Sequence, residues 1–250
     1  MVSALRHTTG KAARWSAACV LVAALLAAAV GRAHAAPRPA CKTAAHGVTY
    51  ALRPASGVLL VRARPGGGAI VGRFGRSDAN GYPSVFGVVG AKLGARCKVA
   101  YYQVQLGTAP NGSSGWVAAW AVRAFTVHSR IEIDLTTHRI SVYRWGKLRL
   151  TAPIAAGTPD TPTPVGHYFV NERWILINPN GPYGVAALGI SAHSTVLHSW
   201  TQGGPIGIHG TNEPRLIGDA ASHGCVRLFN ADMSKLFKLA PAGTPVLIHP

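Results

Sequence analysis

Acidic residues are scarce in this chain of 250 residues, because 8 Asp and Glu face 25 Lys and Arg, for a formal net charge of +17. Residues 36–125 hold eleven basic groups and one acid, whereas residues 126–250 hold ten basic groups and seven acids. Basic nucleic-acid-binding proteins usually carry a clustered patch together with a readable motif. No such motif is present, so the composition does not favour a nucleic-acid partner.

The sequence also lacks an apolar run of the roughly 20 residues that span a bilayer as a helix. The run Trp15–Val30 is sixteen residues long, follows three basic side chains and precedes the small-x-small pattern Ala33–Ala35. This order is typical of a secretory signal peptide. We therefore predict an exported protein with a leader over residues 1–35, cleaved after Ala35. An uncleaved membrane anchor is the alternative.

Cysteine is rare, with four in the chain, and Cys19 lies in the predicted leader. In an oxidising compartment an even pair indicates a disulfide, and an unpaired thiol needs a reason. We predict that Cys41 and Cys97 are bridged, which would stabilise the first domain by about 4 kcal/mol in the chain-entropy model. Cys225 would then be free. A buried, unreactive thiol is the alternative for Cys225.

Helix signals are few, and the sequence predicts a mainly β fold. Short strand-like runs between Gly and Pro clusters indicate a small basic β-barrel over residues 36–125. A second β-rich domain over residues 127–250 begins with alternating strands that are typical of an antiparallel meander. One late helix is predicted, with Asn230 as its N-cap and Pro241 as its stop.

Chemistry-bearing residues are concentrated in two short segments, Ile208–Thr211 and Ser222–Arg227. A secreted thiol is a nucleophile only where a base or cation lowers its pKa and the sulfur is reachable. His209 and His223 are both candidates for the base of Cys225. On an extended segment the side chains of His223 and Cys225 would share a face.

Glycines adjoin both histidines. Gly210 and Gly224 have no side chain and let a substrate backbone approach closely. Backbone N–H groups around Gly224 and Cys225 could form an oxyanion hole for an acyl-transfer intermediate.

A zinc site is the alternative interpretation of His209, His223 and Cys225, because His and Cys are the usual ligands of zinc. The three residues lack the paired spacing of such sites, and no carboxylate is convincingly placed as a fourth ligand. Glu213 and Asp219 in the intervening loop are expected to be solvated. We predict neither a metal nor a cofactor.

The two segments together resemble the signature of YkuD-type L,D-transpeptidases. Ile208-His209-Gly210-Thr211 and Ser222-His223-Gly224-Cys225-Val226-Arg227 match it in order and spacing. Supporting matches run through residues 127–250 and comprise Ile133-Asp134-Leu135, Gly157, Thr163-Pro164-Val165-Gly166 and Gly243-Thr244-Pro245-Val246. Some members carry Asn at the position of Arg227, so the subgroup stays open.

The resemblance implies a β-rich catalytic domain that acts on peptidoglycan stem peptides. By motif position Cys225 is the nucleophile, His209 its general base, and the Gly210 carbonyl orients the imidazole. Ser222, His223, Gly224 and Arg227 would shape the substrate and oxyanion site. The implied reaction cleaves the L-to-D bond of a tetrapeptide stem, releases D-Ala and forms a 3→3 cross-link through a Cys225 thioester.

The same resemblance implies that carbapenems acylate the enzyme. The predicted leader implies an exported protein in the periplasm or associated with the cell wall. Hydrolysis by an L,D-carboxypeptidase with the same site and a non-catalytic wall-binding protein are the alternatives.

The basic N-terminal domain weakly resembles bacterial SH3-like wall-associated domains, through Leu60–Gly66 and Gly115–Val117. Trp116 and Trp120 are expected in its core, since aromatic residues of such small barrels are more often buried than ligand-binding. Its positive charge could bind anionic wall polymers. The alternative is that the charge only keeps the domain soluble.

Overall fold

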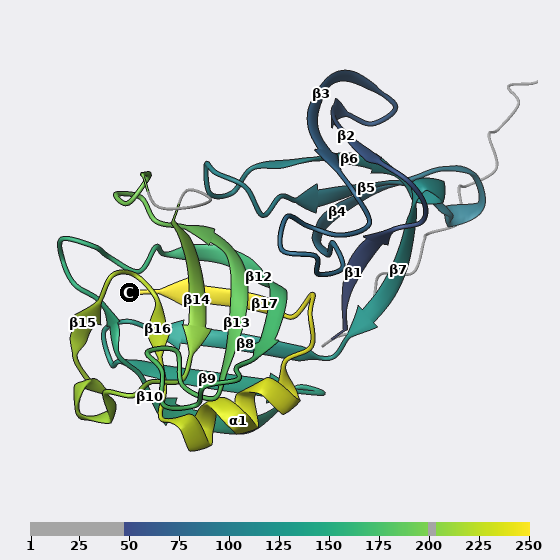
Figure 1. Ribbon diagram of the computed structural model, residues 1–250. Coiled ribbons are helices and arrows are strands. Elements are labelled where there is room, and N and C mark those ends of the chain that lie inside the picture. Colours follow the sequence, from purple (N-terminus) through teal and green to yellow (C-terminus); the bar gives the residue numbers. More distant parts are fainter. Residues whose placement is uncertain (1–47, 200–203) are drawn as a thin grey trace, which may run out of the picture. The chain divides into compact units, whose positions relative to one another are not determined.

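The computed structural model describes residues 48–199 and 204–250, and the predicted leader and Cys41 lie outside this part of the chain. The described residues belong to one compact unit, Thr43–Pro250. They form two large sheets and one α-helix, which confirms the prediction of a mainly β fold with one late helix (Figure 1). No helix in the described ranges is long and apolar enough to cross a membrane.

The first sheet has seven strands in the order β3-β2-β6-β5-β4-β1-β7. Their bounds are β1 Thr49–Pro54, β2 Leu59–Arg64, β3 Gly67–Phe74, β4 Phe86–Leu93, β5 Val99–Gln105, β6 Ser114–Ala118 and β7 Val122–Val127. Two short 3-10 turns, η1 (Ala95–Cys97) and η2 (Ala119–Ala121), interrupt the strands. The strands enclose a small core that includes Leu52, Val61 and Val104.

Trp120 departs from the prediction, because its side chain is 85% exposed. It lies in η2, between the buried residues Val117 and Val122, where the chain turns from β6 into β7. The short turn directs the Trp120 side chain away from the core that contains Val117 and Val122.

The second sheet has eight strands in the order β10-β9-β8-β17-β12-β13-β14-β16. Their bounds are β8 Ser129–Asp134, β9 Arg139–Arg144, β10 Lys147–Pro153, β12 Gly166–Ile175, β13 Ala186–His193, β14 Pro205–His209, β16 Val226–Arg227 and β17 Pro245–His249. Two further strands, β11 (Ala156–Gly157) and β15 (Ala220–Ser222), pair in parallel, and the 3-10 turn η4 (Pro214–Leu216) lies between β14 and β15. β8, β9 and β10 form the predicted meander.

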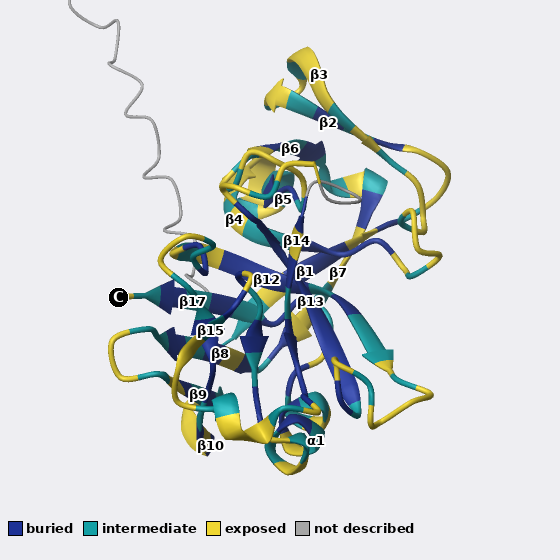
Figure 2. Ribbon diagram, turned by 60° about the vertical axis from the view of Figure 1, so that its left-hand side comes forward, coloured by how far each residue is buried: buried dark blue, intermediate teal, exposed yellow. Residues whose placement is uncertain are grey.

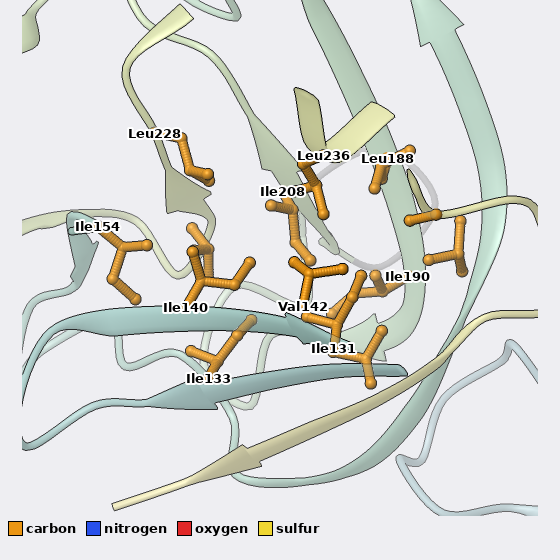
Figure 3. Close-up of a cluster of buried hydrophobic side chains, with 14 of the residues drawn as sticks. Ile131, Ile133, Ile140, Val142, Ile154, Leu188, Ile190, Ile208, Leu228 and Leu236 are labelled. Atoms are coloured by element: carbon orange, nitrogen blue, oxygen red, sulfur yellow. The ribbon is translucent and has the colours of Figure 1, made fainter. Parts of the chain in front are cut away.

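The core of the second sheet fixes the strands that carry the site. Ile131 and Ile140 from the meander meet Leu188 of β13, Ile208 of β14 and Leu228 after β16 (Figure 3). Each of these side chains is fully buried, and burial of one such side chain stabilises a fold by about 1.5–3 kcal/mol. All eight residues of β13 are buried, as the dark strand in Figure 2 shows.

The helix α1 (Asn230–Leu239) packs on β13 through Met233 and Leu236, and it ends before Pro241 as predicted (Figure 1). The prediction of Asn230 as N-cap is wrong. Phe229 occupies the cap position, and its phenyl side chain cannot accept a hydrogen bond. The Asn230 side chain accepts the Thr211 N–H instead.

Hydrogen bonds link the two sheets within this unit. Asn111, between β5 and β6, exchanges two hydrogen bonds of 2.8 Å with the backbone of His193 at the end of β13. The Gln105 side chain donates to the His167 carbonyl at 2.5 Å.

Candidate active site

Two short parallel strands at one edge of the second sheet carry the predicted site. β14 and β16 pair with Ile208 opposite Val226 and with His209 opposite Arg227. Side chains alternate between the two faces of a strand. Because Ile208 and Val226 point into the core, His209 and Arg227 are directed to the other face of the sheet.

Cys225 directly precedes β16 and carries a free thiol. Its sulfur accepts a hydrogen bond of 3.4 Å from the Gly207 N–H. Burial raises the pKa of the Cys225 thiol, while this hydrogen bond and the charge of Arg227 lower it. The sequence predicts a lowered pKa for a nucleophilic cysteine, and the pKa of Cys225 is raised instead. Cys225 is therefore a neutral thiol at neutral pH, and it needs a base to act as a nucleophile.

His209 is 4% exposed, and its Nδ1 lies 2.5 Å from the Gly210 carbonyl oxygen. A carbonyl only accepts, so Nδ1 carries the proton and Nε2 keeps the lone pair. Burial lowers the pKa of His209 to about 4, with a smaller lowering by Arg227 and an opposing effect of the Gly210 hydrogen bond. The imidazole is neutral at neutral pH and can accept a proton.

Asn230 holds the Gly210 segment in place, a role that the sequence did not reveal. Its Oδ1 accepts a hydrogen bond of 3.0 Å from the Thr211 N–H. A Cβ at Gly210 would lie 2.1 Å from this oxygen and 3.2 Å from the Gly184 Cα, so only glycine fits beside it. The first turn of α1 thereby positions the carbonyl that orients His209.

The segment before Cys225 is a tight turn and not the extended path considered from the sequence. Ser222 Oγ donates to the Cys225 carbonyl at 2.5 Å and accepts the Gly224 N–H at 3.1 Å. Gly224 has φ +112°, in the region that favours glycine. His223 is exposed, and it lines a cavity together with Cys225.

The Pro-rich loop between β11 and β12 forms hydrogen bonds with the backbone of this turn. Thr163 Oγ1 donates to the Gly224 carbonyl at 2.9 Å and accepts the Gly157 N–H at 2.9 Å. Thr161 Oγ1 donates to the Ser222 carbonyl at 3.1 Å. These threonines fix the backbone of the cysteine turn without touching its sulfur.

Arg227 forms an ion pair with Glu213, with Nη1 and Oε2 3.1 Å apart. The Glu213 side chain is 44% exposed, so it is partly solvated as expected, and the ion pair is an additional contact. The strand register accounts for the ion pair. Arg227 lies opposite His209, the last residue of β14, and Glu213 follows four residues later in the chain. The ion pair fixes the guanidinium of Arg227, whose positive charge lowers the pKa values of Cys225 and His209.

Two cavities meet at Cys225 and His209. The smaller has a volume of about 110 Å³ and is also lined by His223 and Arg227. The larger, of about 670 Å³, extends toward β12. Tyr183 lines both and contacts the His209 ring edge to face at 4.9 Å. Nothing in the sequence around Tyr183 indicated this contact.

The zinc alternative gains no support from residues 48–199 and 204–250. Among them, no group of three or more His, Cys, Asp and Glu side chains could hold a metal ion.

Comparison with known proteins agrees with this geometry. The family model for the YkuD L,D-transpeptidase catalytic domain matches residues 128–248. The L,D-transpeptidase YkuD of Bacillus licheniformis is 37% identical over 125 residues, which cover 50% of this chain and 68% of the relative. The chain belongs to the YkuD family of L,D-transpeptidases.

Two further proteins are similar to this chain. The YkuD protein of Bacillus subtilis is 33% identical over 125 residues, covering 50% of this chain and 68% of the relative. A crystal structure of an Enterococcus faecium L,D-transpeptidase is 29% identical with a TM-score of 0.39, covering 48% of this chain and 49% of that chain. This chain therefore spans about half of that solved structure.

Proposed function

We propose that this chain is an exported cysteine transpeptidase that cleaves the L-to-D bond of peptidoglycan tetrapeptide stems and forms 3→3 cross-links. The observation that carries the proposal is the β14–β16 register, which brings Cys225 and His209 to the junction of two cavities. Family membership supports the reaction class.

The first half-reaction follows from the neutral state of both groups. His209 Nε2 takes the proton of the Cys225 thiol as the sulfur attacks the carbonyl carbon between the diamino residue and D-Ala. The tetrahedral intermediate collapses when the imidazolium returns the proton to the D-Ala nitrogen. D-Ala leaves, and the stem remains bound as a thioester.

The second half-reaction uses the same base. An amine of another stem attacks the thioester carbonyl, His209 accepts its proton, and the sulfur leaves and is reprotonated. The Gly224 N–H is held by Ser222, so the Cys225 N–H is the remaining donor of the predicted oxyanion pair. Arg227 offsets the negative charge that develops on sulfur.

The experiment incubates the protein with tetrapeptide-bearing muropeptides and separates products by mass. Cross-linked dimers with loss of D-Ala support the transpeptidase, whereas tripeptide alone indicates the carboxypeptidase. The Cys225→Ala variant, with an unchanged melting temperature, should give neither product. Release of D-Ala by that variant would refute the mechanism.

For the first sheet we propose binding to anionic wall polymers. A cavity of about 620 Å³ is lined by Arg53, Arg76 and Arg123 and by no acidic residue. Arg53 lies directly opposite Arg123 in the β1–β7 pair. Like charges at such positions destabilise a sheet, and a bound anion would remove the repulsion.

Export with cleavage after Ala35 and the Cys41–Cys97 disulfide also remain proposals, because residues 1–47 lie outside the described ranges. Mass measurement of the secreted protein tests the cleavage site. Thiol titration of the unfolded, non-reduced mature protein should find one free thiol, whereas three would exclude the bridge.

A further inference from the structure

The larger cavity at the site contains a buried carboxylate. Glu172 of β12 is 9% exposed, in a chain that has only 8 acidic residues. The ion pairs found among the described residues are Arg130–Glu132, Arg227–Glu213 and Lys235–Asp232, so no Lys or Arg in this part of the chain pairs with Glu172.

The immediate partners of Glu172 are neutral or negative. Asn80 Nδ2 donates to both carboxylate oxygens at 3.1 Å. Burial raises the pKa of Glu172, Asp78 raises it further, and the Asn80 hydrogen bond lowers it. A buried carboxylate is costly unless a cation or several donors satisfy it. A cation at this position would offset the negative charge of Glu172 and Asp78.

A second acceptor lies beside it. Asn171 Oδ1 is buried and has no hydrogen-bond partner among the described residues. Neighbouring residues of a strand normally point to opposite faces, but the register shifts between Val170 and Glu172. Such a bulge re-aims side chains. As a result, Asn171 and Glu172 both line the larger cavity.

The walls of this cavity suit an aliphatic chain that ends in the cation. Trp174, Leu176 and Ile190 provide apolar surface, and the cavity also contains Cys225 and His209. A primary ammonium group offers three donors and no acceptor, which matches a carboxylate and an amide oxygen.

We propose that Glu172 and Asn171 form a binding site for the side-chain ammonium group of the diamino residue in the donor stem. This assignment rests on the proposed transpeptidase function. The donor is favoured over the acceptor because an amine held as ammonium is not a nucleophile. The site would select stems whose diamino residue carries a free amine and would align the adjacent carbonyl with Cys225.

The test measures binding in the Cys225→Ala background, where no chemistry occurs. Calorimetry compares a tetrapeptide with a free side-chain amine and the same peptide acetylated on that amine. We expect at least about tenfold tighter binding of the free amine, because a hydrogen bond to a charged group is stronger than one between neutral groups. Glu172→Gln should reduce this preference to near unity. Glu132→Gln, which removes a carboxylate on β8, should retain it.

Asn171→Leu provides a second variant with a smaller expected loss of preference, and it keeps the test valid if Glu172→Gln fails to fold. A folded Glu172→Gln protein that keeps the full preference for the free amine would overturn the proposal. Equal binding of both peptides by Cys225→Ala without a second substitution would also overturn it. Amine-dependent binding without D-Ala release by the intact enzyme would leave this site standing and refute the proposed reaction instead.

Discussion

The two sheets differ in the charge that lines their cavities. In the first sheet three arginines line a cavity without an acid, whereas in the second sheet Glu172 lines the cavity that also contains Cys225. The stem peptides of the proposed reaction carry amines, and the proposed wall polymers are anionic. Net charge alone would have predicted one kind of ligand, whereas the two cavities differ in the charge of their lining residues.

The sheets also differ in how their functional residues are held. The three arginines lie on strands β1 and β7 and after β3 and are exposed, and the Arg53 guanidinium lies 5.0 Å from the centre of the Phe125 ring. Around Cys225, by contrast, Ser222, Thr163 and Asn230 bind the backbone of the two motif segments. Such preorganisation is what acyl transfer requires and polymer binding does not.

Among the variants that compare the two sheets, His209→Ala is expected to cause the largest loss of activity. His209→Ala should lower the rate of carbapenem acylation of Cys225 by about 10²–10⁴, the range of general-base catalysis. His223→Ala should cost less, because His223 lies exposed at the rim. Stopped-flow measurement of both variants checks this. If His223→Ala is the slower variant, His223 is the base.

The pH profile follows from the same residue. Because the pKa of His209 is lowered to about 4, the base stays neutral above that pH. The acylation rate should therefore be lost only as the pH falls through about 4. An exposed histidine would lose activity near its usual value of about 6.5. An inflection near that value in the acylation rate, retained in His223→Ala, would contradict the buried neutral base.

Asn230 should show a moderate effect. Asn230→Ala removes the acceptor of the Thr211 N–H, so we expect about a tenfold lower kcat with little change in KM, equivalent to about 1.4 kcal/mol. Asn230→Asp keeps an oxygen at this position and should restore most of the rate. Equal losses in both variants would assign Asn230 a merely structural role in α1.

The smallest effect is expected in the first sheet. Arg53→Gln should relieve the repulsion with Arg123 and stabilise the protein by about 0.2–1 kcal/mol at low salt. It should also weaken binding to a polyphosphate probe and reduce the salt dependence of that binding. Lys147→Gln on β10 of the second sheet is the matched control. Unchanged polyphosphate binding by Arg53→Gln would contradict the proposal that anionic polymers bind in this cavity.

Much of the second sheet was predictable because its signals are local. Alternating residues predicted the meander, and Pro241 predicted the end of α1. Motif order predicted that His209 and Cys225 belong to one site, and both line the same two cavities. Asn230 could not be predicted as a support of Gly210, because a good N-cap residue has an equally good local explanation. Tyr183 and Glu172 reach the site only through strand pairing and a bulge, which no short-range pattern encodes.

The first sheet was less predictable for a related reason. Composition indicated a basic domain, but the pairing of Arg53 with Arg123 depends on residues far apart in the sequence. Trp120 was assigned to the core by residue type, and a short 3-10 turn exposes it. Both features arise from the path of the chain between strands.

The central claim is that acyl transfer passes through Cys225, and mass spectrometry of the acid-quenched enzyme tests it most directly. The enzyme is mixed with a tetrapeptide stem, quenched in acid within the first turnover and digested. The account predicts an added mass equal to the stem without D-Ala, located on the peptide that contains Cys225 and absent from Cys225→Ala. Turnover without any adduct on Cys225, or an adduct at another residue, would contradict it.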